Sequence, residues 1–273
     1  MTDPPLFEEV SEQAASGSIA EAYADIRRVL GVPMVVFVYR ALAVSPGRLE
    51  HVWGALGANL ACAETQRNAA SLDPPEQGKV APLPRATMVG AGIDPLRLAG
   101  TLDSFDRANR LNLIGLEALL TGAPGDPTTD RGEARSAAPR EMLPMADLAS
   151  LQPGTRALLR RMSVPIAGRE RPMLIPSLFR YFAHSDRLLE AIWQSIGPPI
   201  EDGRFHDSVA VVAQRARQLI GRLPYPVARA EDNDTREIIS RFATTIPGMI
   251  VATKLLRLAL GEYLAPVAER HRS

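Results

Sequence analysis

A polar stripe interrupts the apolar stretch between positions 95 and 120, where four residues follow one another at a spacing of three: Asp103, Asp106, Asn109 and Asn112. Carboxylates are among the side chains that can take a proton from a reacting group. A solvated helix face would also produce such a stripe. Asparagine is a poor helix former, however, and two of them within a good helix need an explanation. The stripe is therefore the first candidate for a site.

Other familiar catalytic motifs are missing from the sequence. Gly90-Ala91-Gly92 lacks the third glycine and the lysine of a phosphate loop, and neither His-Glu-x-x-His nor Gly-x-Ser-x-Gly occurs. The four histidines are scattered, and the single cysteine excludes a disulfide within the chain. His184-Ser185-Asp186 are neighbours, so we interpret them as helix-capping residues rather than as a catalytic triad. We expect no metal and no cofactor.

The elements that position the stripe belong to an internal repeat. Tyr39-Arg40-x-x-Ala43-x-Ser45-x-x-x-Leu49-Glu50-x-x-Trp53-x-x-x-Gly57 returns 140 residues later as Phe179-Arg180-x-x-Ala183-x-Ser185-x-x-x-Leu189-Glu190-x-x-Trp193-x-x-x-Gly197. We interpret the chain as two homologous helical repeats, 1–122 and 153–273, joined by a Pro- and Gly-rich linker, 123–152, whose first half should be mobile. Such a chain would resemble a fused dimer with a pseudo-twofold axis.

A site in a fused dimer should lie between the copies, where the copies differ. The second copy has Met249 at the position of Asn109 and Ala252 at the position of Asn112, and this asymmetry favours a site at the stripe. Tyr39 and Arg40 are pocket candidates as well. Because the second copy repeats them as Phe179 and Arg180, a structural role at the seam competes with that interpretation.

Helical spacing of the apolar residues, without strand-like alternation, predicts an all-α fold. We expect Ser18 to cap a first helix with Glu21 as its partner. Residues 45–47 interrupt the next helical stretch, so that two short helices and one long helix are equally compatible with the sequence there. Asp94 and Pro95 should begin the helix that carries the stripe. The last helix should run from about 235 to 264, with a kink at 247–248.

The composition places few limits on function. Apolar residues make up 46% of the chain, charged residues 23%, and the formal net charge is zero. This balance argues against a nucleic-acid or acidic-membrane partner. No apolar run in the sequence reaches the ~18 residues of a membrane span. We expect a cytoplasmic protein with a small-molecule partner, and whether it forms a homodimer stays open.

Several stretches resemble the group I (DL-) 2-haloacid dehalogenases, also called the halocarboxylic acid dehydrogenase-like family. They are Ser16-Gly17 to Arg27, Val32-Pro33-x-x-x-Phe37-x-x-Arg40-x-Leu42-Ala43, Phe105-x-x-x-Asn109, Ser177-x-Phe179 and Arg215-Ala216-Arg217-x-Leu219-x-x-x-Leu223-Pro224. The resemblance implies an all-helical protein with two repeats and an active site between them. It also implies a reaction in which water directly displaces the halogen and inverts the carbon.

The resemblance assigns roles to individual positions. Phe37 matches a pocket aromatic, Asn109 an asparagine that helps to hold the water, and Ser177 the serine before the water-activating aspartate. The aspartate itself falls on Leu178, and Met34 stands where an active-site tryptophan is found. The catalytic candidates are thus Asn109 and Asp106. The substrate-binding candidates are Met34, Phe37, Tyr39, Arg40, Asn112, Ser177, Leu178, Arg180 and Tyr181.

Three hypotheses about function follow. In the first, the protein displaces a leaving group from a small carboxylic acid, and Asp106 or Asp103 replaces the missing base. In the second, a nucleophile of the substrate itself, such as an amine, closes a ring, so that no water needs activation. In the third, the cavity binds a small acid without catalysis, or the chain is an interaction protein. Arg40, Arg180 or Arg107 in the cavity would favour the first two, because guanidinium groups hold carboxylates.

Overall fold

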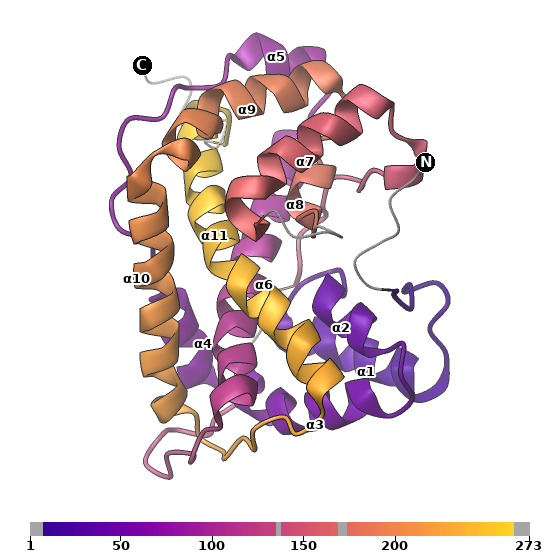
Figure 1. Ribbon diagram of the computed structural model, residues 1–273, viewed down its shortest axis with the longest axis vertical. Helices are drawn as coiled ribbons and strands as arrows, with labels where there is room; N and C mark the ends of the chain where they lie inside the picture. The colour runs from indigo at the N-terminus through magenta and orange to yellow at the C-terminus, as the bar shows by residue number, and fades with distance from the viewer. Residues whose placement is uncertain (1–7, 135–137, 169–173, 265–273) are drawn as a thin grey trace.

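The computed structural model describes residues 8–134, 138–168 and 174–264, and its regular elements in these ranges are helices, with two isolated β-bridges (Figure 1). The all-α prediction is confirmed for this part of the chain. The elements are α1 (Gly17–Leu30), α2 (Phe37–Leu42), α3 (Arg48–Ala61), α4 (Ala63–Ala70), α5 (Arg85–Gly90), α6 (Pro95–Thr121), the 3₁₀ turn η1 (Leu148–Ser150), α7 (Pro153–Ala167), α8 (Ser177–Arg180), α9 (Asp186–Glu201), α10 (Gly203–Leu219), the 3₁₀ turn η2 (Ile220–Arg222) and α11 (Asn233–Leu264).

Two long central helices, α6 and α11, form the most extensive contact between elements, and Figure 1 shows them crossing in the middle of the molecule. On one side α3 packs against α1, α4 and α6, and on the other α9 packs against α7, α10 and α11. The short helices cross over between these groups, since α2 contacts α11 and α8 contacts α6. The region where α2, α6, α8 and α11 meet is therefore built from both halves of the chain.

Helix boundaries follow local chemistry in most places. Asp94 caps α6, because its Oδ1 accepts hydrogen bonds from the backbone N–H groups of Leu96 and Arg97, and Pro95 is the first helical residue. Ser185 caps α9 by accepting from Leu188 N. The predicted caps of these two helices are confirmed. Residues 45–47 separate α2 from α3, so this stretch forms two helices rather than one.

The predicted cap of the first helix is wrong. α1 begins at Gly17 after Ser16, and the Ser18 hydroxyl donates instead to Glu50 Oε1 of α3 at 2.6 Å. The side-chain contact between two helices replaces the capping box, so Ser18 fixes α1 on α3 rather than starting it.

The linker makes more contacts than a freely mobile segment would. Ala123 N and Asp126 N donate to carbonyls of Val227 and Leu223, and Ala134 N donates to Ala61 O. Farther on, Leu143 N donates to Thr101 Oγ1, and Ala146 N donates to Arg180 O. The described parts of the linker thus connect to both halves, and the mobility expected of its first half stays a prediction.

The closing helix α11 contains Pro247, but its non-helical backbone angles occur at Gly261 rather than at 247–248. Its segment Asn233–Gly261 is long and apolar enough to cross a membrane by length and composition, and 78% of the most apolar window is buried inside the protein. Burial of this kind is what a central core helix requires.

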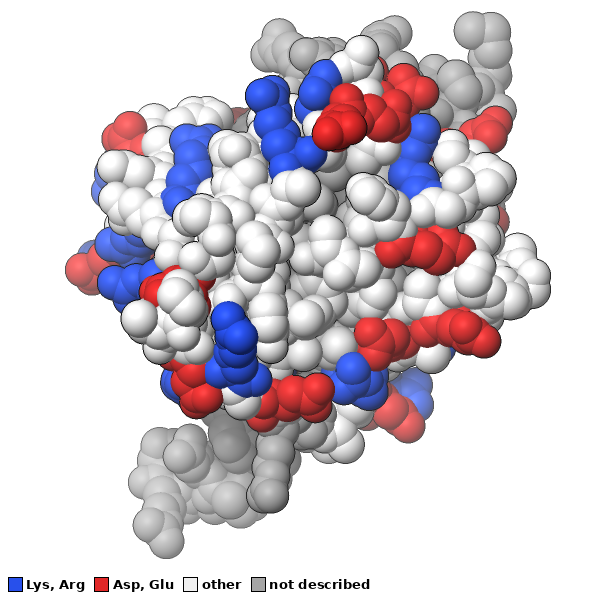
Figure 2. All heavy atoms as spheres, turned by 90° about the horizontal axis from the view of Figure 1, so that it is seen from below, with Lys and Arg blue, Asp and Glu red and all other residues white. Residues whose placement is uncertain are grey.

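Charges of both signs lie interspersed over the face drawn in Figure 2, which views the molecule from the lower end of Figure 1. Among the ion pairs of the protein, Arg48 contacts both Asp232 and Asp234. This face therefore carries no large field of one sign.

Candidate active site

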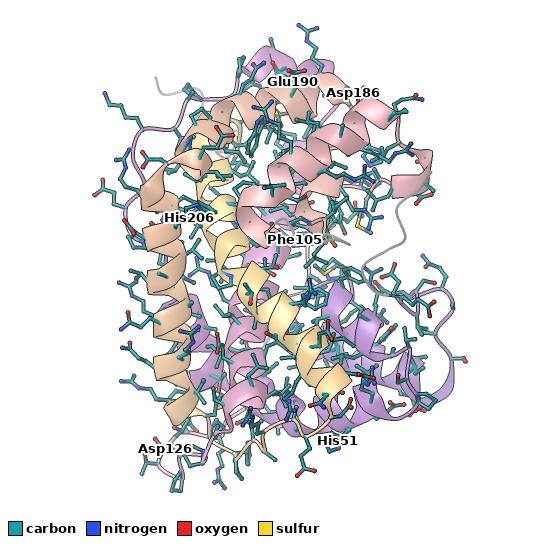
Figure 3. All side chains as sticks on the ribbon, viewed as in Figure 1. His51, Phe105, Asp126, Asp186, Glu190 and His206 are labelled. Carbon is teal, nitrogen blue, oxygen red and sulfur yellow. The ribbon has the colours of Figure 1, made fainter. Side chains whose placement is uncertain are left out.

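A cavity of about 110 Å³ lies where the two halves meet. Its walls come from α2 and the turn before it, from α6, from α8 and the residues beside it, and from α11; Phe105 of α6, labelled in Figure 3, lies in this central region. The lining residues are Glu12, Met34, Val35, Val36, Phe37, Val38, Arg40, Phe105, Asn109, Asn112, Met145, Leu174, Ile175, Pro176, Ser177, Leu178, Tyr181, Phe242, Thr245, Ile246 and Met249. Most of them are apolar, as is usual for a small-molecule pocket.

Many lining residues occur in pairs that are 140 positions apart. Residues 34 to 38 and 174 to 178 all line the cavity, and so do Phe105 with Thr245 and Asn109 with Met249. Both halves of the chain thus contribute to the wall, and two thirds of the lining residues lie at positions spaced by 140. The side chains at these positions differ, which makes the cavity chemically asymmetric.

The two asparagines of the polar stripe reach the cavity. Asn109 is 8% exposed and Asn112 1% exposed, and both line the wall. The Asn109 amide nitrogen is buried and has no hydrogen-bond partner, whereas Asn112 Oδ1 accepts from the Tyr39 hydroxyl at 2.8 Å. An unpaired buried donor costs about 1–3 kcal/mol, so the Asn109 amide is suited to a ligand acceptor.

The two aspartates of the stripe do not line the cavity. Asp106 Oδ1 accepts from Arg110 Nε at 2.8 Å, and Asp103 pairs with Arg140 and Arg257. A step of three residues turns a helix of 3.6 residues per turn backwards by about 60°. Four such positions therefore spread over half of the helix circumference, and only Asn109 and Asn112 face the cavity.

The two repeated arginines differ in their partners. Arg180 donates from Nε and Nη2 to Ala146 O at 3.1 and 3.0 Å and does not line the cavity. Arg40 lines it, pairs through Nη1 with Glu9 at 3.2 Å, and leaves its buried Nε without a partner. Burial first, and then the nearby charge of Arg40, lowers the pKa of Arg180. Arg107, the third arginine considered, donates to Leu30 O and to Gln66 outside the cavity.

Residues 177, 178 and 181 line the cavity together, and their role in substrate binding stays a prediction. Leu178 is fully buried and presents an apolar surface there. Tyr181 is 7% exposed, and burial raises the pKa of its hydroxyl, so at neutral pH it is an uncharged donor. Ser177 is partly buried and adds a second hydroxyl.

Aromatic and sulfur-containing side chains form the apolar part of the cavity. Phe37 packs edge-to-face on Phe242 with ring centroids 5.4 Å apart, and the Arg40 guanidinium lies over the Phe37 ring at 5.5 Å. Phe105 packs in the same manner on Tyr181. Met34 lines the wall on the first-half side.

Tyr39 occupies a different place from the one predicted. It is fully buried behind the cavity wall, against Trp53 and Asn112, and burial raises the pKa of its hydroxyl. Tyr39 donates a hydrogen bond to Asn112, so Asn112 of the polar stripe helps to hold α2 against α6.

Glu12 is a lining residue that sequence reasoning missed. Its Oε1 accepts from Val35 N at 2.9 Å, and its Oε2 pairs with Arg27 at 2.6 Å. It precedes α1 in an irregular segment, so no helical or strand pattern points to it. Met145 of the linker was missed for the same reason, and Phe242 of α11 was missed because helical spacing alone does not show which face of that helix meets the cavity. The 140-residue shift from Phe105 could have found Thr245.

Within the described ranges, no group of three or more His, Cys, Asp or Glu residues is placed to hold a metal ion. His51 and His206, labelled in Figure 3, lie in different parts of the molecule. The chemistry available to this cavity is that of its amide, guanidinium, hydroxyl and carboxylate groups.

No family model matches the chain. It is 25% identical over 240 residues to a configuration-inverting 2-haloacid dehalogenase from Alcaligenes xylosoxydans xylosoxydans, which covers 82% of this chain and 80% of that protein. A second relative, an (R)-2-haloacid dehalogenase from Pseudomonas putida, is 40% identical over 52 residues, which is 19% of this chain and 17% of the relative.

The solved structures of D-2-haloacid dehalogenases have the same fold. A complex with L-LA superposes with a TM-score of 0.80 at 16% identity and covers 95% of this chain and 98% of that one. A mutant in complex with D-2-CPA gives 0.76 at 18% identity with the same coverage. The chain is thus similar in sequence, over most of its length, to a configuration-inverting 2-haloacid dehalogenase, and it has the helical fold of the D-2-haloacid dehalogenases.

Proposed function

We propose that this protein is an enzyme that displaces a leaving group, such as a halide, from carbon 2 of a small carboxylic acid held in the cavity between its halves. The observation that carries the proposal is a pair of buried, unpartnered donors, Arg40 Nε and Asn109 Nδ2, on residues that line one small apolar cavity. Similarity to 2-haloacid dehalogenases supports the reaction type.

The binding step would use the positive end of the cavity. The carboxylate of the substrate accepts hydrogen bonds from Arg40, and the Tyr181 hydroxyl lies close enough for the charges of Arg40 and Arg180 to act on it. Bonds to charged groups contribute about 1.5–3 kcal/mol each. The carbon chain would then contact Phe37, Met34 and Leu178.

The displacement step would take place beside Asn109. Its amide can orient an attacking water or stabilise the departing anion, and either role matches a donor that no protein group satisfies. The apolar walls exclude bulk water, which strengthens each of these hydrogen bonds.

We also propose that the two halves are related by a pseudo-twofold axis. The 140-residue spacing of the lining residues and the matching helix contacts in each half support this relation. In this arrangement, function depends on the pairs that differ, such as Asn109 with Met249.

The test is halide release from each enantiomer of 2-chloropropionate by the wild type, Asn109→Ala and Asp106→Asn. We expect release by the wild type, a loss of about 10²- to 10³-fold for Asn109→Ala, as for removal of one transition-state donor, and little change for Asp106→Asn. Absence of release by the wild type with both enantiomers would refute the hydrolytic proposal.

Halide release from the two enantiomers of 2-chloropropionate shows whether the enzyme accepts both configurations at carbon 2 or only one. The resemblance to the group I (DL-) enzymes predicts release from both, whereas the relatives named (R) and D-specific suggest release from one. The ratio of the two rates decides between them.

A second candidate is ring closure by a nucleophile of the substrate. The observation that favours it is the apolar side chain of Leu178 on the wall, which can activate no water. It predicts no halide release from 2-chloropropionate, but release from a 2-chloro acid with a terminal amine. If the protein releases halide from neither of these acids but still binds them, it is a binding protein rather than an enzyme.

A further inference from the structure

Glu12 is the only residue with a carboxylate among the described residues that line the cavity. The neighbouring acids do not line the cavity; Asp106 pairs with Arg110, Asp103 with Arg140 and Arg257, and Glu9 with Arg40. A proton released during displacement by water therefore has one carboxylate within the cavity wall to accept it.

The Glu12 carboxylate is held in a fixed orientation. Oε1 accepts from Val35 N, and Oε2 accepts from Arg27 Nη1. A carboxylate has about four lone-pair positions, so these two bonds leave each oxygen one further acceptor position. Its side chain is 27% exposed, so the proton can pass on to solvent.

The segment that carries Glu12 is itself anchored to the site. Val10 N donates to Arg40 O at 3.1 Å, and the Tyr23 hydroxyl donates to Val10 O at 2.8 Å. The segment that carries Glu12 is thus tied to the backbone of Arg40 through Val10. Precise positioning of this kind is what a general base needs.

We propose that Glu12 is the general base of this cavity and takes a proton from the attacking water. The step rests on the proposed displacement function. The water oxygen forms a bond to carbon 2 while the carbon–halogen bond breaks, and the halide leaves with the bonding pair. The water proton moves to Glu12, which leaves a 2-hydroxy acid, a halide ion and a protonated carboxyl that returns its proton to solvent.

The main test compares Glu12→Gln with Arg27→Gln in the full chain. Glutamine retains an oxygen for Val35 N but cannot take the proton, so we expect turnover to fall about 10²- to 10⁴-fold. Binding of 2-hydroxypropionate, measured by calorimetry, should change less than about threefold, since a neutral isostere keeps the contact with Val35. Arg27→Gln breaks the same ion pair but keeps the carboxylate, so it should retain most of the activity.

The pH profile separates a base from a mere structural contact. The groups around the Glu12 carboxylate are Arg27 and Tyr23 of α1, Arg40 of α2, Tyr181 after α8, and Glu9 of its own segment. A general base gives the turnover rate a limb that falls towards acid pH, and this limb should be lost in Glu12→Gln. A structural contact would lower activity at every pH without moving that limb.

Single turnover in ¹⁸O-labelled water distinguishes a base from a nucleophile. Direct attack by water places the label in the product of the first turnover, whereas attack by Glu12 itself would give an unlabelled product. An unlabelled product, turnover by Glu12→Gln within about threefold of the wild type, or equal losses in both variants would overturn the proposal. In each of these cases the wild type still releases halide, so the proposed function stands; a wild type without halide release overturns both.

Discussion

The two walls of the cavity occupy matching positions in the two halves but provide different groups. The first-half wall contains Arg40 with an unpaired Nε and Asn109 with an unpaired amide, whereas the second half has Arg180 bound to a backbone carbonyl and Met249. Equal sequence positions thus lead to unequal chemistry. The difference arises because the linker carbonyl of Ala146 accepts from the Nε of Arg180, whereas Arg40 pairs with Glu9 through Nη1 and its Nε stays without a partner.

A second comparison lies behind the walls. Tyr39 and Asn112 form a buried hydrogen-bonded pair in the first half, and the corresponding residues of the second half are Phe179 and Ala252, which are both fully buried and apolar. Either pair satisfies the rule that buried polar groups are hydrogen-bonded. A tyrosine opposite an alanine, or a phenylalanine opposite an asparagine, would leave a buried polar group without a hydrogen-bond partner.

The largest expected difference concerns the two arginines. Arg40→Gln should weaken binding of 2-chloropropionate about 10- to 100-fold, because a hydrogen bond to a charged group contributes roughly 1.5–3 kcal/mol. Arg180→Gln, the matched control, should change binding much less, since its donors already serve Ala146. Calorimetric titration measures both, and equal losses would mean that the walls do not differ in carboxylate recognition.

The next largest effect concerns the stability of the buried hydrogen-bonded pair of Tyr39 and Asn112. Asn112→Ala leaves the Tyr39 hydroxyl buried without a partner and should reduce the free energy of unfolding by about 1–3 kcal/mol. The double variant Tyr39→Phe/Asn112→Ala copies the second half and should recover part of that loss. Urea unfolding of the two single variants and the double variant measures the coupling, and strictly additive losses would contradict the pairing.

The repeated Trp-x-x-x-Gly motif offers a smaller comparison. A Cβ at Gly197 would lie 2.9 Å from the Trp193 ring, whereas one at Gly57 would lie 3.3 Å from the Trp53 ring. Overpacking costs about 1–3 kcal/mol, and alanine recovers roughly 1 kcal/mol of helix propensity. Gly197→Ala should therefore destabilise the protein more than Gly57→Ala does in thermal unfolding, and the reverse order would contradict the closer packing in the second half.

The smallest effect should appear at alkaline pH. Burial raises the pKa of Tyr23 from 10.0 to about 12. The folded protein holds this proton more tightly than the unfolded chain, so the contribution to stability is complete below pH 10 and is lost as the pH rises towards 12. Tyr23→Phe should flatten the decline of stability between these values. Unfolding curves at pH 8 and pH 11 test this, and an unchanged decline would assign the effect to Tyr39 or to other groups.

The sequence by itself determined most of the helical framework. Asp94 and Pro95 place the start of α6, Ser185 that of α9, and residues 45–47 the division between α2 and α3, because caps and helix breakers act through neighbours in the chain. It also indicated Asn109, since an asparagine within an apolar helix calls for a reason that lies outside that helix.

Only the tertiary structure decided which polar groups are available for chemistry. Asp106 pairs with Arg110 of its own helix, and Arg110 pairs with Asp73 beyond the end of α4, so this face of α6 lies away from the cavity. Likewise, Arg40 and Arg180 read alike in the sequence, and Glu12 lies in an irregular segment. Helical periodicity fixes the angle between side chains on one helix, but packing between distant segments fixes what each side chain meets.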